Sequence, residues 1–235
     1  MFVSAFSTGY PSLVPAVWRS KITGGGLPVE EYHTLAAEAA AEFTQRRSRF
    51  IGHAAPISTE EEAARFINRV RAENRDAAHN VYAYRLKESA AVRCSDDGEP
   101  QGTAGQPVLN VLVRSGATDA AVVVTRYFGG ILLGAGGLVR AYSNSASLAV
   151  AQARVVHMRA CVVGEIFCSY SQYGKISALV ASRGGVEEDA EFTDTVKFGF
   201  HIKSGDFPSL QSELADATGG TCGITVRERA FFRMD

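Results

Sequence analysis

One group of residues that could do chemistry lies around an arginine that follows a run of valines. Two aromatic residues and two glycines come directly after it, giving the series Arg126, Tyr127, Phe128, Gly129 and Gly130. Glycine permits the close approach of a ligand or a neighbouring element, and a helix N-terminus beside an arginine attracts anions. The glycines that follow lack the lysine of a P-loop, and Val139 stands where a dinucleotide-binding motif needs its last glycine. The stretch is therefore either a tightly packed turn with a structural arginine or an anion-contacting site.

A second cluster is acidic and contains Asp96, Asp97 and Glu99 within four residues. Three carboxylates at this spacing suit Mg²⁺ binding or general acid–base chemistry. The alternative is a solvated turn whose carboxylates cap backbone amides and pair with arginines such as Arg93 or Arg126. A surface that binds a partner is the third possibility.

His79 is the histidine of most interest, because it lies on an expected strand beside the acidic turn. It would suit a general base, but the sequence offers no nucleophile for it: Val81 has no reactive group, and Cys94 has no partner. The other histidines and the four cysteines are scattered without metal-ligand spacing. We therefore predict no catalytic residue, no metal site and no cofactor, and a hydrogen-bonded structural role for His79 unless it contributes to binding.

Arginines also recur along one expected helix. Arg65 and Arg69 are four residues apart, as are Arg71 and Arg75, so each pair lies on one helix face. Such stripes, together with Arg46, Arg47 and Arg49, suit phosphate contacts. Glutamates interleave with the helical arginines, however, so a solvated, salt-bridged face is the competing interpretation.

The elements that position these residues follow from periodicity. A helix is expected over 59–74, with Ser58 and Glu61 at the spacing of a capping box and a buried stripe of Ala63, Phe66, Ile67 and Val70. Thr103 with Gln106 is expected to cap the next helix, around 108–113. Strands are expected over 48–54 and 79–86, a central strand over 120–125, and a helix rich in small residues over 134–155.

The last part of the chain has a different pattern. Its apolar alternation predicts strand, helix, strand, strand, helix and strand over 161–169, 172–182, 185–193, 195–204, 207–218 and 223–229. This βαββαβ order within a short segment is typical of the ferredoxin-like fold.

Composition limits the class of protein. The chain has 235 residues, 46% hydrophobic and 21% charged, with a formal charge of −1, which indicates a globular protein of one or two domains. Residues 29–156 carry 14 basic and 14 acidic residues, and 157–235 carry 8 and 11. We expect an unstructured leader over 1–28 and domains over 29–156 and 157–235.

The sequence shows neither a membrane span nor a secretory signal, so we expect a cytoplasmic protein.

These motifs carry a resemblance to a known family. The stretches 78–84, 95–107 and 123–134 are similar to those of the YigZ/IMPACT family, and the resemblance runs from about Tyr32 to the C-terminus. It implies an α+β protein with a βα sandwich like domain 2 of ribosomal protein S5, followed by a ferredoxin-like domain. Relatives often have cysteine where this chain has Val81, which argues against thiol chemistry on that strand.

The resemblance also implies a link to translation, because eukaryotic relatives regulate translation initiation under stress. Our leading hypothesis is a non-enzymatic module that contacts RNA, the ribosome or a translation-associated protein. The expected binding residues are Arg126, Tyr127, Phe128, Gly129, Gly130, Asp96, Asp97, Glu99, His79, Arg65 and Arg69. Direct RNA binding requires that the arginines gather on one face. The alternatives are a regulator that binds only protein, and a hydrolase of a small phosphorylated or peptide-like substrate.

Overall fold

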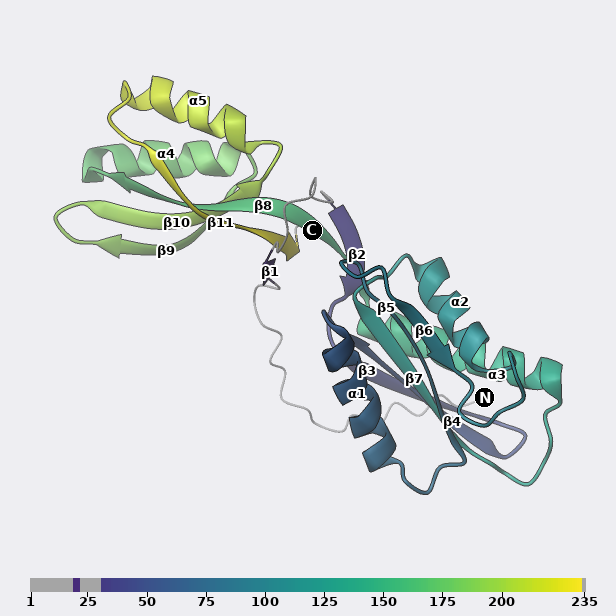
Figure 1. Cartoon of the computed structure of the whole chain (residues 1–235). Helices are drawn as coiled ribbons and strands as arrows, with labels where there is room; N and C mark the ends of the chain where they lie inside the picture. The colour runs from purple at the N-terminus through teal and green to yellow at the C-terminus, as the bar shows by residue number, and fades with distance from the viewer. Residues whose placement is uncertain (1–18, 22–30, 234–235) are drawn as a thin grey trace. The chain divides into compact units, whose positions relative to one another are not determined.

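The computed structural model describes residues 19–21 and 31–233, and the chain forms two compact units that meet in sequence between Val156 and His157 (Figure 1). Both units mix helices with antiparallel strands, which confirms the α+β class and the two-domain architecture. Of the expected leader, residues 19–21 form strand β1, and the rest lies outside the described residues. No helix in the described parts is long and apolar enough to cross a membrane.

The first unit is built on a five-stranded antiparallel sheet in the order β3-β4-β7-β5-β6. Its strands are β3 (Ala39–Gln45), β4 (Ser48–Pro56), β5 (His79–Arg85), β6 (Val92–Ser95) and β7 (Ala120–Tyr127). A further strand, β2 (Glu31–Leu35), precedes β3. The predicted central position of the valine run is confirmed, because β7 is buried along almost its whole length between β4 and β5.

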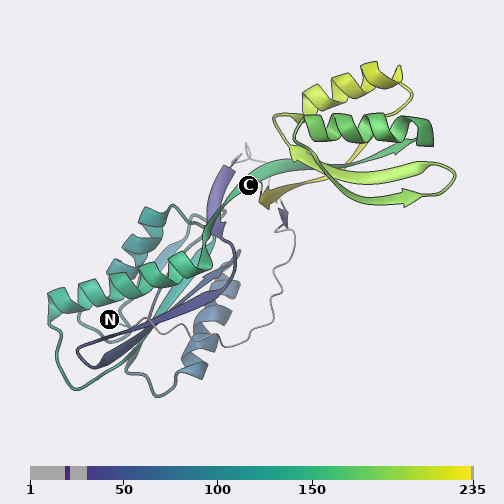
Figure 2. The ribbon, with the colours of Figure 1, turned by 180° about the vertical axis from the view of Figure 1, so that it is seen from behind.

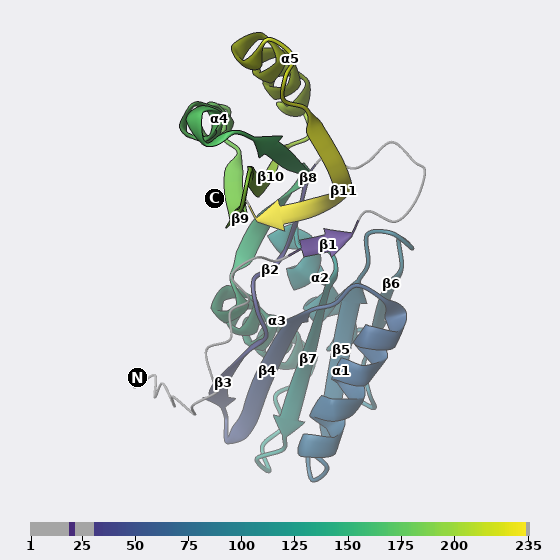
Figure 3. The same cartoon turned by 90° about the vertical axis from the view of Figure 1, so that its left-hand side faces the viewer.

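Helices cover both faces of this sheet (Figures 2 and 3). One face carries α1 (Glu60–Glu73), whose buried residues are the predicted Ala63, Phe66, Ile67 and Val70. The other face carries α2 (Gly105–Ser115) and α3 (Ala135–Ala153). The small residues of α3 allow close packing: a Cβ added to Gly52 of β4 would lie 2.5 Å from the carbonyl oxygen of Ser145.

The residues predicted to cap the N-termini of α1 and α2 are both wrong. The cap of α1 is Thr59, whose hydroxyl accepts from the amide of Glu62, while the Glu62 carboxylate accepts from the amide of Ser58. Ser58 and Thr59 both suit an N-cap, so local spacing did not decide between them. The Thr103 hydroxyl donates to the carbonyl oxygen of Pro100 instead of capping α2.

The second unit has the predicted βαββαβ order. Its elements are β8 (Val155–Cys168), α4 (Tyr170–Ser182), β9 (Val186–Phe192), β10 (Val196–Lys203), α5 (Phe207–Thr218) and β11 (Ile224–Arg233). The sheet order β11-β8-β10-β9, with every pair antiparallel, is that of the ferredoxin-like fold. Strand β1 (Arg19–Lys21) extends this sheet by pairing with β11.

Candidate functional site

Arg126 lies near the end of β7 and points into the core on the α3 side of the sheet. Only 5% of the residue is exposed. Its Nη1 donates to Oε1 of Glu99 at 2.5 Å, and its Cζ lies 5.6 and 5.5 Å from the ring centroids of Phe50 and Phe128. Glu99 is also buried and accepts a second hydrogen bond, at 2.7 Å, from the hydroxyl of Tyr142 on α3. Of the arginines that the sequence offered to the acidic cluster, Arg126 pairs with Glu99, and the pair is buried and joins β7, the acidic turn and α3.

The hydroxyl of Tyr142 is fixed as a hydrogen-bond donor. Burial, reinforced by the hydrogen bond to Glu99, raises the pKa of Tyr142 far above its ordinary value, so the hydroxyl keeps its proton. Nε of Arg126 is buried and finds no hydrogen-bond partner among the described residues. The guanidinium is thus held by Glu99 through Nη1, donates through Nη2 to the Ser48 hydroxyl at 3.5 Å, and packs against aromatic rings.

His79 opens β5 and lies against the acidic turn. Its Nδ1 is 2.8 Å from the carbonyl oxygen of Asp97, and its Nε2 is 3.8 Å from Oε1 of Glu99. Because a carbonyl oxygen only accepts, Nδ1 carries a proton in this arrangement. His79 therefore helps to hold the acidic turn on the sheet.

The other two carboxylates of the turn also have built-in partners. Oδ1 of Asp96 accepts from the amides of Ala104 and Gly105 at 3.0 and 2.8 Å, and Oδ2 accepts from Gly102 at 2.9 Å. Burial raises the pKa of Asp96, but these three hydrogen bonds outweigh it and hold the pKa below its ordinary value. The carboxylate thereby caps α2, the function that we had expected of Thr103.

Asp97 has φ of 44° and connects two neighbouring elements. Its Oδ2 accepts from the amide of Asn80 at 2.7 Å, and its Oδ1 accepts from Arg71 of α1 at 2.6 Å. Each carboxylate of the acidic turn therefore has a different structural partner. The described residues contain no group of ligands that could hold a metal ion.

The loop after β7 places apolar side chains at the surface. Phe128, Ile131 and Leu132 are 51%, 41% and 80% exposed. Gly129 packs against the β3–β4 turn, where an added Cβ would lie 2.0 Å from the carbonyl carbon of Arg47, so only glycine fits there. Gly130 has φ of 80°, a conformation that favours glycine. The two glycines thus allow the loop to turn while it stays attached to the hairpin.

Tyr127 and the helical arginines point away from this loop. The Tyr127 hydroxyl donates to Oδ1 of Asn74 at 2.8 Å, at the end of α1. Arg69 pairs with Glu38 at 2.6 Å, and Arg65 approaches Glu62 at 3.8 Å. Because α1 covers one face of the sheet and Arg126 points into the other, the predicted arginines do not form a single cationic face.

Sequence reasoning missed several residues that build the site. Ser48 accepts from the amide of Gly129 at 3.3 Å, and Phe50 packs against Arg126. Tyr142 supplies the second bond to Glu99 and is a large aromatic residue in a helix of mostly small ones, which is a signal that could have drawn attention to it. Phe50 and Ser48 had no comparable local signal.

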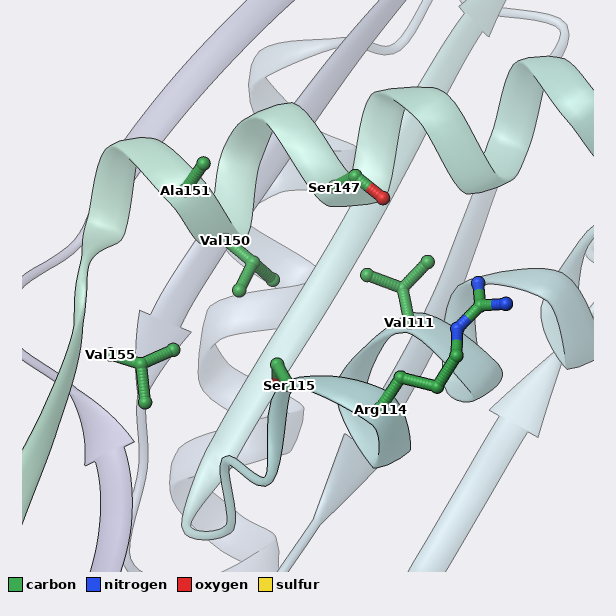
Figure 4. A pocket seen from close by; sticks show the side chains of 7 residues that line it. All are labelled: Val111, Arg114, Ser115, Ser147, Val150, Ala151 and Val155. Carbon is green, nitrogen blue, oxygen red and sulfur yellow. The ribbon is translucent and has the colours of Figure 1, made fainter.

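A shallow hollow lies elsewhere on the first unit, between α2 and α3 (Figure 4). It is lined by Val111, Arg114, Ser115, Ser147, Val150, Ala151 and Val155. None of the predicted site residues lines it, and its mostly apolar lining brings together no acid, base and nucleophile.

Comparisons with known proteins agree with the motifs. The Impact N-terminal domain matches residues 46–150, and a domain of unknown function, DUF1949, matches residues 166–221. The IMPACT family member YvyE of Bacillus subtilis (strain 168) is 33% identical over 204 residues, which cover 86% of this chain and 94% of YvyE. The IMPACT family member YigZ of Escherichia coli (strain K12) is 35% identical, with 78% and 91% covered.

A solved structure described as a crystal structure of a hypothetical protein shares 32% sequence identity, with a TM-score of 0.55, and the match covers 86% of this chain and 99% of that one. The identity and coverage of these relatives, taken with the Impact N-terminal match, show that the chain belongs to the IMPACT family.

Proposed function

We propose that this protein is a non-enzymatic regulator linked to translation, which binds a protein partner through its first unit. Membership of the IMPACT family supports a regulatory, translation-associated role at the level of the family. The first unit carries the Impact N-terminal match and the exposed apolar loop, so it is the unit to which we assign binding. The proposal places the protein in the cytoplasm, where translation takes place.

The burial of Arg126 is the observation that favours a protein partner over RNA. A nucleic-acid-binding protein usually presents a basic face to phosphates. Here Arg126 pairs with Glu99 inside the core, and Arg65 and Arg69 pair with glutamates on the opposite side of the sheet. The loop that follows Arg126 exposes aliphatic and aromatic surface, which suits contact with another protein.

A hydrolase is the second candidate, because His79 lies within hydrogen-bond distance of the acidic turn. The groups that would assist it are already engaged, however: Asp97 with Arg71, and Glu99 with Arg126. Acid–base catalysis would need at least one of these carboxylates to be released. The arrangement therefore favours a structural role for this cluster.

The test is affinity capture from a cell lysate with the tagged full-length protein, with and without ribonuclease. We expect capture of a protein of the translation machinery that survives ribonuclease, and protection of residues 32–156 from hydrogen exchange when the purified partner is added. Capture that disappears with ribonuclease would restore the RNA hypothesis. Protection confined to residues 157–233 would contradict the assignment to the first unit.

A further inference from the structure

Two exposed arginines lie beside the exposed apolar loop of the first unit. Arg46 and Arg47 form the turn between β3 and β4, and the loop contributes Phe128, Ile131 and Leu132. We call these five residues the arginine–apolar edge. Their placement combines two chemistries, positive charge and aliphatic or aromatic surface, on neighbouring segments that are far apart in the sequence.

The contacts beneath the edge fix the two segments to each other. Gly129 lies so close to the backbone of Arg47 that an added Cβ would lie 2.0 Å from its carbonyl carbon. The amide of Gly129 also donates to the Ser48 hydroxyl at 3.3 Å. Arg126, held by Glu99, packs against the ring of Phe128. The buried ion pair therefore positions the exposed loop, and the edge is organised before any partner arrives.

No described residue compensates the charges of Arg46 and Arg47. Neither residue forms an ion pair with any residue in 31–233, whereas the next arginine in the strand, Arg49, makes a bidentate pair with Glu42. Uncompensated guanidinium groups next to apolar surface complement carboxylates next to apolar side chains.

The backbone of the turn supports a role beyond folding. Gln45 pairs with Ser48, so Arg46 and Arg47 form a two-residue hairpin loop, with φ of 45° and 65°. Such loops favour Asn-Gly, because ordinary residues are strained at positive φ. Two consecutive arginines in this conformation are destabilising, and strain of this kind concentrates at binding sites.

We propose that the arginine–apolar edge binds an acidic amphipathic segment of a partner protein, an inference that rests on the proposed function. The partner's carboxylates pair with Arg46 and Arg47, while its apolar side chains cover Ile131, Leu132 and the exposed side of Phe128. RNA fits less well, because Phe128 is the single aromatic residue of the edge, and the aliphatic side chains of Ile131 and Leu132 offer no stacking surface for further bases. An anionic membrane also fits less well, because one short loop and two cations provide little anchoring.

The probe is a fluorescein-labelled, 18-residue helical peptide with leucine and phenylalanine along one face and glutamates flanking that face, so that both kinds of side chain can meet the edge together. Its binding to the full-length protein is followed by fluorescence anisotropy. We expect saturable binding that weakens about tenfold with Leu132→Ser and about tenfold with Arg46→Asn/Arg47→Gly. The double variant removes both charges and places the favoured residues in the turn, so its loss of binding cannot be attributed to unfolding.

Matched controls and competing ligands make the result decisive. Val113→Ser removes an exposed valine of α2, and Arg114→Asn removes the exposed arginine that follows it on the same helix; both should leave binding unchanged. A peptide with lysine in place of glutamate should not bind. The proposal is overturned if the edge variants bind like wild type, if the lysine peptide binds equally, or if phosphatidylserine vesicles or single-stranded RNA displace the peptide with higher affinity.

The two proposals fail in different ways. If a ribonuclease-resistant partner is captured equally by wild type and by the edge variants, the translation-linked function stands and the arginine–apolar edge is not its site. If the peptide binds as expected but lysate capture depends entirely on RNA, the edge is a binding surface and the proposed function is wrong.

Discussion

Replacing Arg126 with methionine distinguishes a structural arginine from one that contacts a ligand. Methionine keeps most of the apolar volume of the side chain but leaves the buried Glu99 carboxylate with the Tyr142 hydroxyl as its remaining strong partner. Removing one member of a buried ion pair costs about 3–5 kcal/mol. Because both side chains are almost fully buried, with 6% and 4% exposed, we expect Arg126→Met to lower the stability of the first unit by this amount.

A second substitution tests the cause of that loss. In Arg126→Met/Glu99→Gln the uncompensated charge is gone, and a neutral amide replaces it beside Tyr142. Since buried ion pairs and neutral replacements of similar volume are often nearly equal in stability, the double variant should recover most of the loss, to within about 1–2 kcal/mol of wild type. Arg140→Met, which removes an exposed arginine of α3, should change stability by less than about 0.5 kcal/mol.

Hydrogen exchange of the β7 amides is the suitable assay, because it reports the stability of the first unit separately from that of the second. A purely structural role for Arg126 is refuted if Arg126→Met lowers stability by less than about 1 kcal/mol and still abolishes capture of the partner. That result would show that Arg126 contacts the partner directly. If Arg126→Met/Glu99→Gln is no more stable than Arg126→Met, the unpaired charge of Glu99 is not the cause of the lost stability.

Three further predictions follow from other features of the first unit. Arg46→Asn/Arg47→Gly should raise its stability by about 1 kcal/mol by relieving the left-handed turn, as measured by hydrogen exchange of β3 and β4; lower stability would show that the turn is not strained. Asp96→Ala should speed exchange of the Gly102, Ala104 and Gly105 amides and destabilise the unit by about 1–2 kcal/mol, and unchanged exchange would argue against the cap. Burial lowers the pKa of His53, so the unfolded state takes up a proton near pH 6.5 before the folded state does, and stability should fall between pH 7 and 5. His53→Gln should flatten this slope, and an unaltered slope would assign the pH dependence to other groups.

The sequence predicted those features whose causes are local. The stripe of Ala63, Phe66, Ile67 and Val70 lies where its spacing placed it, and the βαββαβ order was evident because each element has its own periodicity. The central position of β7 followed from its unbroken apolar run, since an edge strand would expose part of that surface.

Apart from the cap of α1, where two neighbouring residues both suit the position, the errors concern contacts between residues that are distant in the sequence. Asp96 reaches eight and nine residues ahead to cap α2, which no capping-box spacing describes. Glu99 accepts hydrogen bonds from Arg126, which is 27 residues after it in the sequence, and from Tyr142, which is 43 residues after it. The sequence motif singled out these residues, but whether the arginine faces solvent or the core depends on folding.

The pairing of β1 with β11 has a consequence for synthesis of the protein. Arg19 lies opposite Phe232, so β1 leaves the ribosome well before the strand with which it pairs. At roughly 5–20 residues per second, β1 waits about 10–40 s for its partner, while the whole first unit is made in between. During that interval the backbone amide and carbonyl groups of β1 have no hydrogen-bond partners on β11. The second unit therefore cannot complete its sheet in the order of translation, because the pairing of β1 with β11 forms only after β11 has been made.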